Sequence, residues 1–142
     1  MRSVRELLES KPAGLFTVDA EDPVRTAIQL MADHHCGALP VMRGAELVGI
    51  ISERDYARKV VLMGRNSAET PVWQIMSSPV ISVSLDDRVR HCMELMTAKR
   101  IRHLPVVEND TLLGMISIGD CVRVVIESQQ QEIDELKRYI VT

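Results

Sequence analysis

The chain has 142 residues, a formal net charge of −3 at pH 7 and only 3% aromatic residues. This acidic balance argues against a protein that works on nucleic acid or on an anionic membrane, since both usually require a basic surface. No apolar run approaches the roughly 20 residues that span a bilayer, and the first residues lack the apolar core of a secretory signal. The length suits one compact domain or two closely packed halves.

The cysteines and histidines predict neither a disulfide framework nor a metal centre. Cys36, Cys92 and Cys121 are scattered and odd in number, which favours reduced thiols and a cytoplasmic location. His34 and His35 lie beside Cys36 but form no spaced ligand set with residues elsewhere. We also expect no enzyme, because no nucleophile can be matched with a base and an orienting group.

The first segment of the chain predicts a short helix, a strand and a longer helix. Residues 4–9 favour a helix that stops before Pro12, and the apolar run 15–18 is typical of a strand. Asp22 precedes Pro23, which fits a helix N-cap followed by proline at the first helical position. The next apolar residues recur at the spacing of one helix face, as Val24, Ala27, Ile28 and Met31.

A hairpin and a second helix complete this first unit. Two apolar runs, residues 38–42 and 46–51, are separated by a polar turn and predict paired strands. A helix is then expected to begin near Ser52. Residues 63–78 hold glycine, asparagine, serine and proline, which break regular structure, so we interpret them as a connection between units.

The second half of the chain repeats the first without a gap. Four pairs of identical residues stand 65 positions apart, namely Pro40 and Pro105, Gly49 and Gly114, Ser52 and Ser117, and Asp55 and Asp120. The second copy therefore predicts the same elements, with Asp87 as the N-cap, a helix face of Val89, Cys92, Met93 and Met96, strands at 103–107 and 111–116, and a helix from Ser117. Two like units can bury their apolar faces against each other, and the cleft between them suits a small ligand.

The sequence thus predicts an α/β (α+β) protein of two β-α-β-β-α units. We expect a first repeat with an N-terminal helix over residues 1–64, a linker over 65–78, a second repeat over 79–126 and a C-terminal helix over 127–142. On that last helix, Ile126, Ile133, Leu136 and Ile140 fall at heptad-like steps. This stripe is expected to pack either on its own domain or on a partner subunit.

The sharpest chemical motif is Gly-x-x-Ser-x-x-Asp. The chain carries it twice, at Gly49, Ser52 and Asp55 and at Gly114, Ser117 and Asp120. It falls where a buried strand ends and a helix begins, and the free N–H groups of a helix start attract phosphate. Serine adds a donor, and aspartate is an acceptor pair suited to two vicinal ribose hydroxyls. The same spacing also makes a capping box, which duplication would copy as faithfully as a binding site.

The whole pattern resembles the cystathionine-β-synthase (CBS) domain family in its tandem form, the Bateman module. In the first copy the resemblance rests on Pro23-Val24-x-x-Ala27-Ile28-x-x-Met31, Gly37-Ala38-Leu39-Pro40-Val41 and Leu47-Val48-Gly49-Ile50-Ile51-Ser52-x-x-Asp55. In the second it rests on Val89-x-x-Cys92-Met93-x-x-Met96, Arg102-His103-Leu104-Pro105-Val106-Val107 and Leu113-Gly114-Met115-Ile116-Ser117-x-x-Asp120. Together these motifs cover about residues 15–126.

The resemblance implies two repeats packed through their sheets about a pseudo-twofold axis, with two related clefts. The clefts of the family bind adenine nucleotides such as AMP, ADP, ATP or NAD(H), or S-adenosylmethionine, and do not turn them over. AMP is the first expectation here, as a regulatory ligand and not as a catalytic cofactor. A homodimer of such pairs and an unidentified effector protein are the expected partners.

Carried over to this chain, the resemblance assigns residues to each cleft. The first cleft would hold Ser52, Arg54, Asp55, Arg102 and His103, with Val80, Ile81 and Val83 near the base. The second would hold Ser117, Asp120, Gly37 and Ala38, with Leu15, Phe16 and Val18 near the base.

The two expected clefts differ in charge. Arg102 and His103 in the first can meet a phosphate, and an arginine fork can hold one bidentately. The second has only small residues at the matching positions, so that Lys11 or Arg123 would have to supply a cation. We therefore expect the first cleft to prefer a phosphorylated nucleotide. A structural dimerisation module with vestigial clefts and an S-adenosylmethionine binder stay as alternatives.

Overall fold

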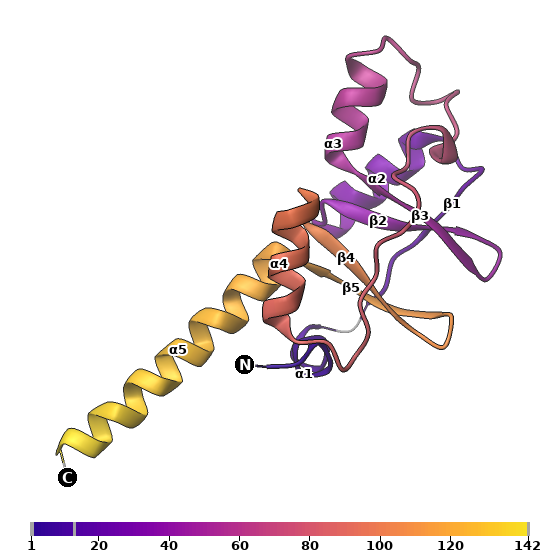
Figure 1. The fold of residues 1–142 in the computed structure, drawn as a ribbon. Helices are drawn as coiled ribbons and strands as arrows, with labels where there is room; N and C mark the ends of the chain where they lie inside the picture. The colour runs from indigo at the N-terminus through magenta and orange to yellow at the C-terminus, as the bar shows by residue number, and fades with distance from the viewer. Residues whose placement is uncertain (1, 13, 142) are drawn as a thin grey trace.

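The computed structural model describes residues 2–12 and 14–141, which form two similar units joined by an extended connection (Figure 1). The first unit comprises β1 (Val18–Asp19), α2 (Val24–His34), β2 (Ala38–Arg43), β3 (Glu46–Ser52) and α3 (Glu53–Tyr56), which continues as one π-helical turn, η1 (Ala57–Val61). The second comprises α4 (Val89–Lys99), β4 (His103–Glu108), β5 (Thr111–Ser117) and α5 (Ile118–Val141). A helix, α1 (Val4–Ser10), precedes the first unit, and a 3-10 turn, η2 (Val72–Gln74), lies in the connection.

The two hairpins confirm the duplication in detail. Strand β2 pairs antiparallel with β3, and β4 pairs antiparallel with β5. Each hairpin has a register shift at the same place, between Val41 and Met42 and between Val106 and Val107. Strand β1 pairs parallel with β2, whereas its counterpart in the second unit is a single parallel bridge, Val83 to Val106. All four hairpin strands lie within one residue of the predicted ranges.

Each unit has its own apolar core, and the two cores use matching positions. The predicted helix faces supply Val24, Ala27 and Met31 to the first core and Val89, Cys92 and Met96 to the second. The sheets add Val18, Leu39, Val41 and Ile51 to the first and Val83, Leu104, Val106 and Ile116 to the second. Aliphatic and sulfur-containing side chains fill both cores, as the low aromatic content requires.

Each core is completed by a segment that lies outside its own unit in the sequence. Helix α1 adds Val4 and Leu7 to the core of the second unit, and the connection adds Val72 and Ile75 to the core of the first. Backbone hydrogen bonds hold both segments in place, since the N–H groups of Val4 and Val72 each donate to a carbonyl of the unit they join, at 2.8 Å. The division of the chain into ranges made from the sequence stays a prediction, but α1 packs on the second unit.

The motif glycines lie beneath these two added segments. A Cβ on Gly114 would lie 3.0 Å from Leu8 Cδ2 on α1. A Cβ on Gly49 would collide with Met76 Sδ and would lie 3.1 Å from the carbonyl oxygen of Ser77. The group that approaches each glycine backbone is therefore a segment of the same chain.

The starts of the first long helix in each unit differ from the expectation. The sequence placed Asp22 and Asp87 at the N-caps, but α2 and α4 begin one residue later, after Pro23 and Arg88. Each aspartate Oδ2 accepts a hydrogen bond from the N–H group three residues before it, at 3.3 Å and 2.8 Å. The carboxylates thus close the turn before the helix and do not cap the helix itself.

The predicted strand 15–18 is shorter than expected, because β1 begins only at Val18. Its register pairs Val18 with Val41, so the next position of β2 is Pro40, which has no N–H group to donate. Leu15 and Phe16 consequently lie outside the sheet and are exposed.

Helix α5 starts on the body of the protein and then leaves it (Figure 1). Cys121 and Val124 are buried, whereas every side chain from Gln129 to Ile140 is exposed. The expected apolar stripe therefore does not pack on its own domain. Among the helices of residues 2–12 and 14–141, none has the length and apolar character needed to cross a membrane.

Replacing Leu39 or Leu104 by alanine tests the two duplicated cores. Each leucine is at most 1% exposed, and truncating a buried leucine costs about 2–5 kcal/mol because apolar area is lost and a cavity is left. We expect urea denaturation to give a loss of this size for both variants. Leu62→Ala, at a side chain that is 77% exposed, should stay within about 0.5 kcal/mol of wild type. A loss at only one of the two leucines would contradict equivalent cores.

Candidate functional site

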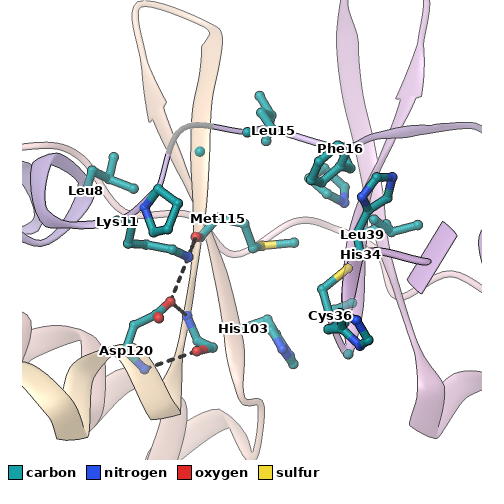
Figure 2. Close-up of a pocket in the computed structure, with 18 of the residues that line it drawn as sticks. Leu8, Lys11, Leu15, Phe16, His34, Cys36, Leu39, His103, Met115 and Asp120 are labelled. Atoms are coloured by element: carbon teal, nitrogen blue, oxygen red, sulfur yellow. Dashed lines mark hydrogen bonds and ion pairs between the residues drawn. The ribbon is translucent and has the colours of Figure 1, made fainter. Parts of the chain in front are cut away.

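A cavity of about 630 Å³ lies between the two units (Figure 2). Its walls come from α1 and the segment after it, from the end of α2 and the start of β2, and from β4, β5 and the start of α5. The volume falls within the range of about 300–1,000 Å³ that is typical of small-molecule sites. Six of the seven residues expected in the second cleft line it, namely Leu15, Phe16, Gly37, Ala38, Ser117 and Asp120.

Ser117 and Asp120 cap the N-terminus of α5 and also line the cavity. The N–H group of Asp120 donates to Ser117 Oγ at 3.1 Å, and the N–H group of Ser117 donates to Asp120 Oδ2 at 2.9 Å. This reciprocal pair is the capping box that the sequence offered as the alternative interpretation. Both residues also line the cavity, so the capping role and the lining role are compatible.

Lys11 supplies the cation that the second cleft lacked in the sequence motifs. Its Nζ donates to Asp120 Oδ2 and to the carbonyl oxygen of Met115, both at 2.8 Å (Figure 2). Burial by itself would raise the pKa of Asp120, but hydrogen bonds from Lys11 and Ser117 outweigh it and hold that pKa below its ordinary value. Arg123 is more distant, with Nη1 4.0 Å from Asp120 Oδ1.

His103 lies in this cavity, whereas the sequence grouped it with Ser52 and Asp55. The ring lies close to Gly37, where a Cβ would be 3.4 Å from His103 Cε1 and 3.2 Å from Glu53 Oε1. Burial lowers the pKa of His103, and the charges of Lys11 and Arg102 lower it further against the opposing pull of Asp120. The imidazole is therefore biased toward its neutral form.

An aromatic pair forms the opposite wall of the cavity. The rings of Phe16 and His34 stack with centroids 3.5 Å apart and planes at 11° (Figure 2). His34 and His35, at the end of α2, also line the cavity, although the sequence reading gave neither a role there. They precede the Gly37-to-Val41 motif, with Cys36 in between. No signal in the sequence assigned them to a cleft, because the resemblance implicates only Gly37 and Ala38 in this part of the chain.

The three cysteines are free thiols in two different settings. Cys36 lines the cavity, and burial raises its pKa. Cys92 and Cys121 lie in the core of the second unit, where burial raises their pKa values to about 12 and about 11. Within the described residues, no group of three or more His, Cys, Asp or Glu side chains is arranged to hold a metal ion.

Val18 and Val83, which the resemblance places near a ligand base, are buried. Each is at most 4% exposed and packs in the core of its own unit. Both also form the parallel pairing with the next strand of their unit. Val18 also borders a second hollow, of about 530 Å³, near the tips of the two hairpins.

Asp55, which is expected in the first cleft, has several hydrogen-bond and ion-pair partners within the chain. Ser52 and Asp55 form a second capping box, with hydrogen bonds of 3.0 Å and 3.2 Å between backbone and side chain. Asp55 Oδ1 also makes an ion pair with Lys59 Nζ at 3.0 Å and accepts a hydrogen bond from Ser77 Oγ at 3.3 Å. Asp55 is only 8% exposed. The described partners of this carboxylate thus come from its own repeat and the connection.

The remaining residues expected in the first cleft come from α3, from the segment before β4 and from the connection. Arg54 Nη1 donates to the carbonyl oxygen of Arg100 at 3.3 Å, which joins the start of α3 to the segment before β4. Arg102 follows in that segment and is exposed. Val80 and Ile81 are half-buried in the connection that leads to α4.

Comparison with known proteins identifies relatives of the same architecture. The chain is 46% identical to a solved protein with CBS domains from Burkholderia ambifaria, with 90% of this chain and 96% of that chain covered and a TM-score of 0.87. It is 42% identical to the CBS domain-containing protein CBSX3, mitochondrial, of Arabidopsis thaliana, over 84% of this chain and 61% of that protein. It is 32% identical to the CBS domain-containing protein YhcV of Bacillus subtilis, over 84% of this chain and 83% of that protein.

The chain thus spans less than two thirds of the Arabidopsis relative but most of the two bacterial ones. The family model of the CBS domain matches it twice, over residues 4–62 and 72–127. These two stretches correspond to the two units with their completing segments, and together they take up most of the sequence. The protein therefore belongs to the CBS domain family and is a CBS domain pair.

Proposed function

We propose that this CBS domain pair binds an adenosine-containing nucleotide between its repeats and signals through a change of shape or association. CBS-pair proteins are regulatory or signalling modules. The observation that carries the finer proposal is the cavity of about 630 Å³, because residues of both repeats line it. A ligand that contacts both repeats favours one arrangement of them over another, which is the physical basis of such a signal.

The polar end of the cavity suits a ribose phosphate. The carboxylate of Asp120 can accept hydrogen bonds from two vicinal hydroxyls, and Lys11 Nζ, 2.8 Å from it, can meet a phosphate. The N–H groups at the start of the 24-residue α5 add a partial positive charge on the same side. A phosphate near His103 would also favour its protonated form against the effect of burial.

The apolar end of the cavity suits a purine. Phe16 and His34 already form a flat stacked pair at this end. Aromatic rings favour offset stacking on such a surface. Leu15 and Met115 border the same space with apolar side chains. An adenosine compound therefore matches the cavity at both ends.

Ligand binding here would compete with an existing ion pair. A ribose that bonds to Asp120 Oδ2 shares that oxygen with Lys11, so the lysine must shift or turn to the phosphate. Lys11 directly follows α1, and α1 completes the core of the second repeat through Val4 and Leu7. The exchange at Asp120 is thus linked to the position of a helix, which supports a conformational signal.

We extend the proposal to the other cleft, with Ser52, Arg54, Asp55, Arg102 and the half-buried Val80 and Ile81. Arg102 supplies the fork that suits a phosphate. The preference of this cleft for the more highly charged ligand stays a prediction. Recovery of AMP only beside Ala38, in crystals soaked with AMP, would contradict that ranking.

A sulfur-containing nucleoside is the second candidate ligand. A solved CBS domain pair, 22% identical to this chain with a TM-score of 0.78, forms a complex with 5′-methylthioadenosine and S-adenosyl-L-methionine. A structural module with vestigial clefts is the competing function. We assign the chain no catalytic step, a homodimeric state and an effector protein of unknown identity. Its three free thiols support a reducing compartment such as the cytoplasm.

A melting-temperature screen distinguishes the ligands from the structural alternative. The screen covers AMP, ADP, ATP, NAD, NADH and S-adenosylmethionine. A ligand present at 100 times its dissociation constant should add about 2.7 kcal/mol of stability. No shift with any of these compounds would support vestigial clefts and contradict the proposal.

Asp120→Asn and Asp55→Asn assign the shift to a cleft. Each asparagine keeps an acceptor for the helix start but loses the carboxylate that would hold two ribose hydroxyls. We expect titration calorimetry to show at least tenfold weaker ligand binding in the altered cleft, which corresponds to a loss of about 1.4 kcal/mol of binding free energy. Equal ligand affinity in both variants and in wild type would show that neither aspartate binds the ligand.

Lys11→Met tests the ion pair through the pH dependence of stability. The folded state lowers the pKa of Asp120, so the stabilisation is complete above its ordinary value of 3.8 and is lost as pH falls through the lower folded value. We expect urea titrations to show that the variant loses about 1–3 kcal/mol of unfolding free energy near neutral pH. The difference in stability between wild type and variant should shrink as the pH is lowered. Arg5→Met, which breaks an exposed pair with Asp86, should change stability by less than about 1 kcal/mol. A difference in stability that does not change with pH would contradict an ion pair between Lys11 and Asp120.

A further inference from the structure

We propose that α5 pairs with α5 of a second copy of this chain as a parallel two-stranded coiled coil. The surface concerned is the α5 stripe, formed by Val122, Ile126, Gln129, Ile133, Leu136 and Ile140. It lies outside the nucleotide clefts, and the inference does not rest on the proposed function.

The stripe lies on a different face of α5 from the one that holds the helix to the body. Cys121, Val124 and, in part, Val125 pack into the core of the second repeat. At about 100° per residue, the stripe is rotated by roughly a quarter turn from these core contacts. Beyond them, α5 projects away from the rest of the molecule (Figure 1). The repeats therefore cannot cover the stripe.

The stripe is apolar, exposed and regularly spaced. Its members follow one another at alternating steps of four and three residues, which is the repeat of a coiled-coil seam. The five apolar side chains are between 41% and 82% exposed. An identical stripe on a second copy covers them about a twofold axis, because such an interface is self-complementary.

The residue types within the stripe favour two parallel strands. With Ile126, Ile133 and Ile140 at the a positions, the d positions fall on Val122, Gln129 and Leu136. Isoleucine at a with leucine at d is typical of parallel dimers. The polar Gln129 occupies a d position of the seam, which lowers the stability of the pair.

The charges beside the stripe point to the same orientation. Glu132 occupies a g position and Lys137 the next e position, and a parallel pair sets Glu132 of one copy against Lys137 of the other. The two copies make this contact twice, with opposite charges each time. An antiparallel pair would match e positions with each other, and Lys137 would then meet only Gln130 or Arg123. Charge complementarity thus selects a second copy in parallel.

The coil is short, fewer than three heptads, so paired helices of this length are only marginally stable in isolation. The test must therefore report on α5 itself within the full chain, because the repeats can also associate. Site-directed disulfides meet this need, since two cysteines must come within about 6–7 Å at Cα to be bridged.

Single cysteines at Gln129 and Leu136, each in a Cys36→Ser background, provide the test. Residues at d face their own counterparts across a parallel seam, so we expect both Gln129→Cys and Leu136→Cys to give disulfide-linked dimers under mild oxidation. Gln131→Cys, on the outer face, is the matched control and should give at least tenfold less. An antiparallel pair allows self-bridging at no more than one of these sites. One bridge only, none at all, or an equal yield at Gln131→Cys would each overturn the proposal; the absence of bridges would also indicate a different protein as the partner.

Charge reversal in the Leu136→Cys chain gives a second test. Glu132→Lys and Lys137→Glu each replace two attractive contacts by repulsive ones, and we expect the yield of disulfide-linked dimer to fall by about tenfold. The double variant exchanges the two charges and should recover this yield to within about twofold. Gln131→Lys, a change of charge outside the seam, should leave the yield unaltered. Failure of the double variant to recover would overturn the parallel register.

Discussion

The fold depends on one packing constraint: neither repeat can complete its apolar core with its own residues. Val4 and Leu7 enter the second core from the start of the chain, and Val72 and Ile75 enter the first core from the connection. Without them, the helix and sheet of each repeat would leave large apolar side chains in contact with water. The added segments also run along the edges between the repeats. The position of the cavity wall that contains Lys11 therefore follows from the packing of α1.

A second constraint comes from the two half-buried helix starts. Each holds an aspartate whose charge must be matched, and each finds a lysine, but from different places in the chain. Asp55 pairs with Lys59 on the following turn, whereas Asp120 pairs with Lys11 from the segment after α1. The two helix starts are consequently alike in backbone and differ in where their cation comes from. The cap sets the position of each carboxylate, and the lysine occupies one of its oxygens.

The sequence predicted most of the fold because the fold is governed by local pattern. Apolar spacing and turn residues located both hairpins and both helix faces, and the repeat located the second set from the first. The errors arose where hydrogen bonds decide between neighbouring residues. Asp22 and Asp87 bond backward into a turn, and Pro40 cannot extend the pairing to the residues before β1. The cavity was predicted in outline, and Lys11 was named as one of two possible cations, but His103 was assigned to the other cleft. The contacts of His103 with Gly37 and of Lys11 with Asp120 join segments far apart in the chain, which leave no local pattern in one sequence.

The three thiols differ in a way that has a practical consequence. Cys92 and Cys121 are enclosed in a core that keeps them protonated, with pKa values of about 12 and about 11, and thiols in that form are inert toward electrophiles. Cys36 alone combines partial exposure with a place in the cavity wall. A small alkylating reagent therefore has a single accessible target in the unaltered protein. The rate at which Cys36 is alkylated therefore reports on access to this wall of the cavity, without a fluorophore or an engineered residue.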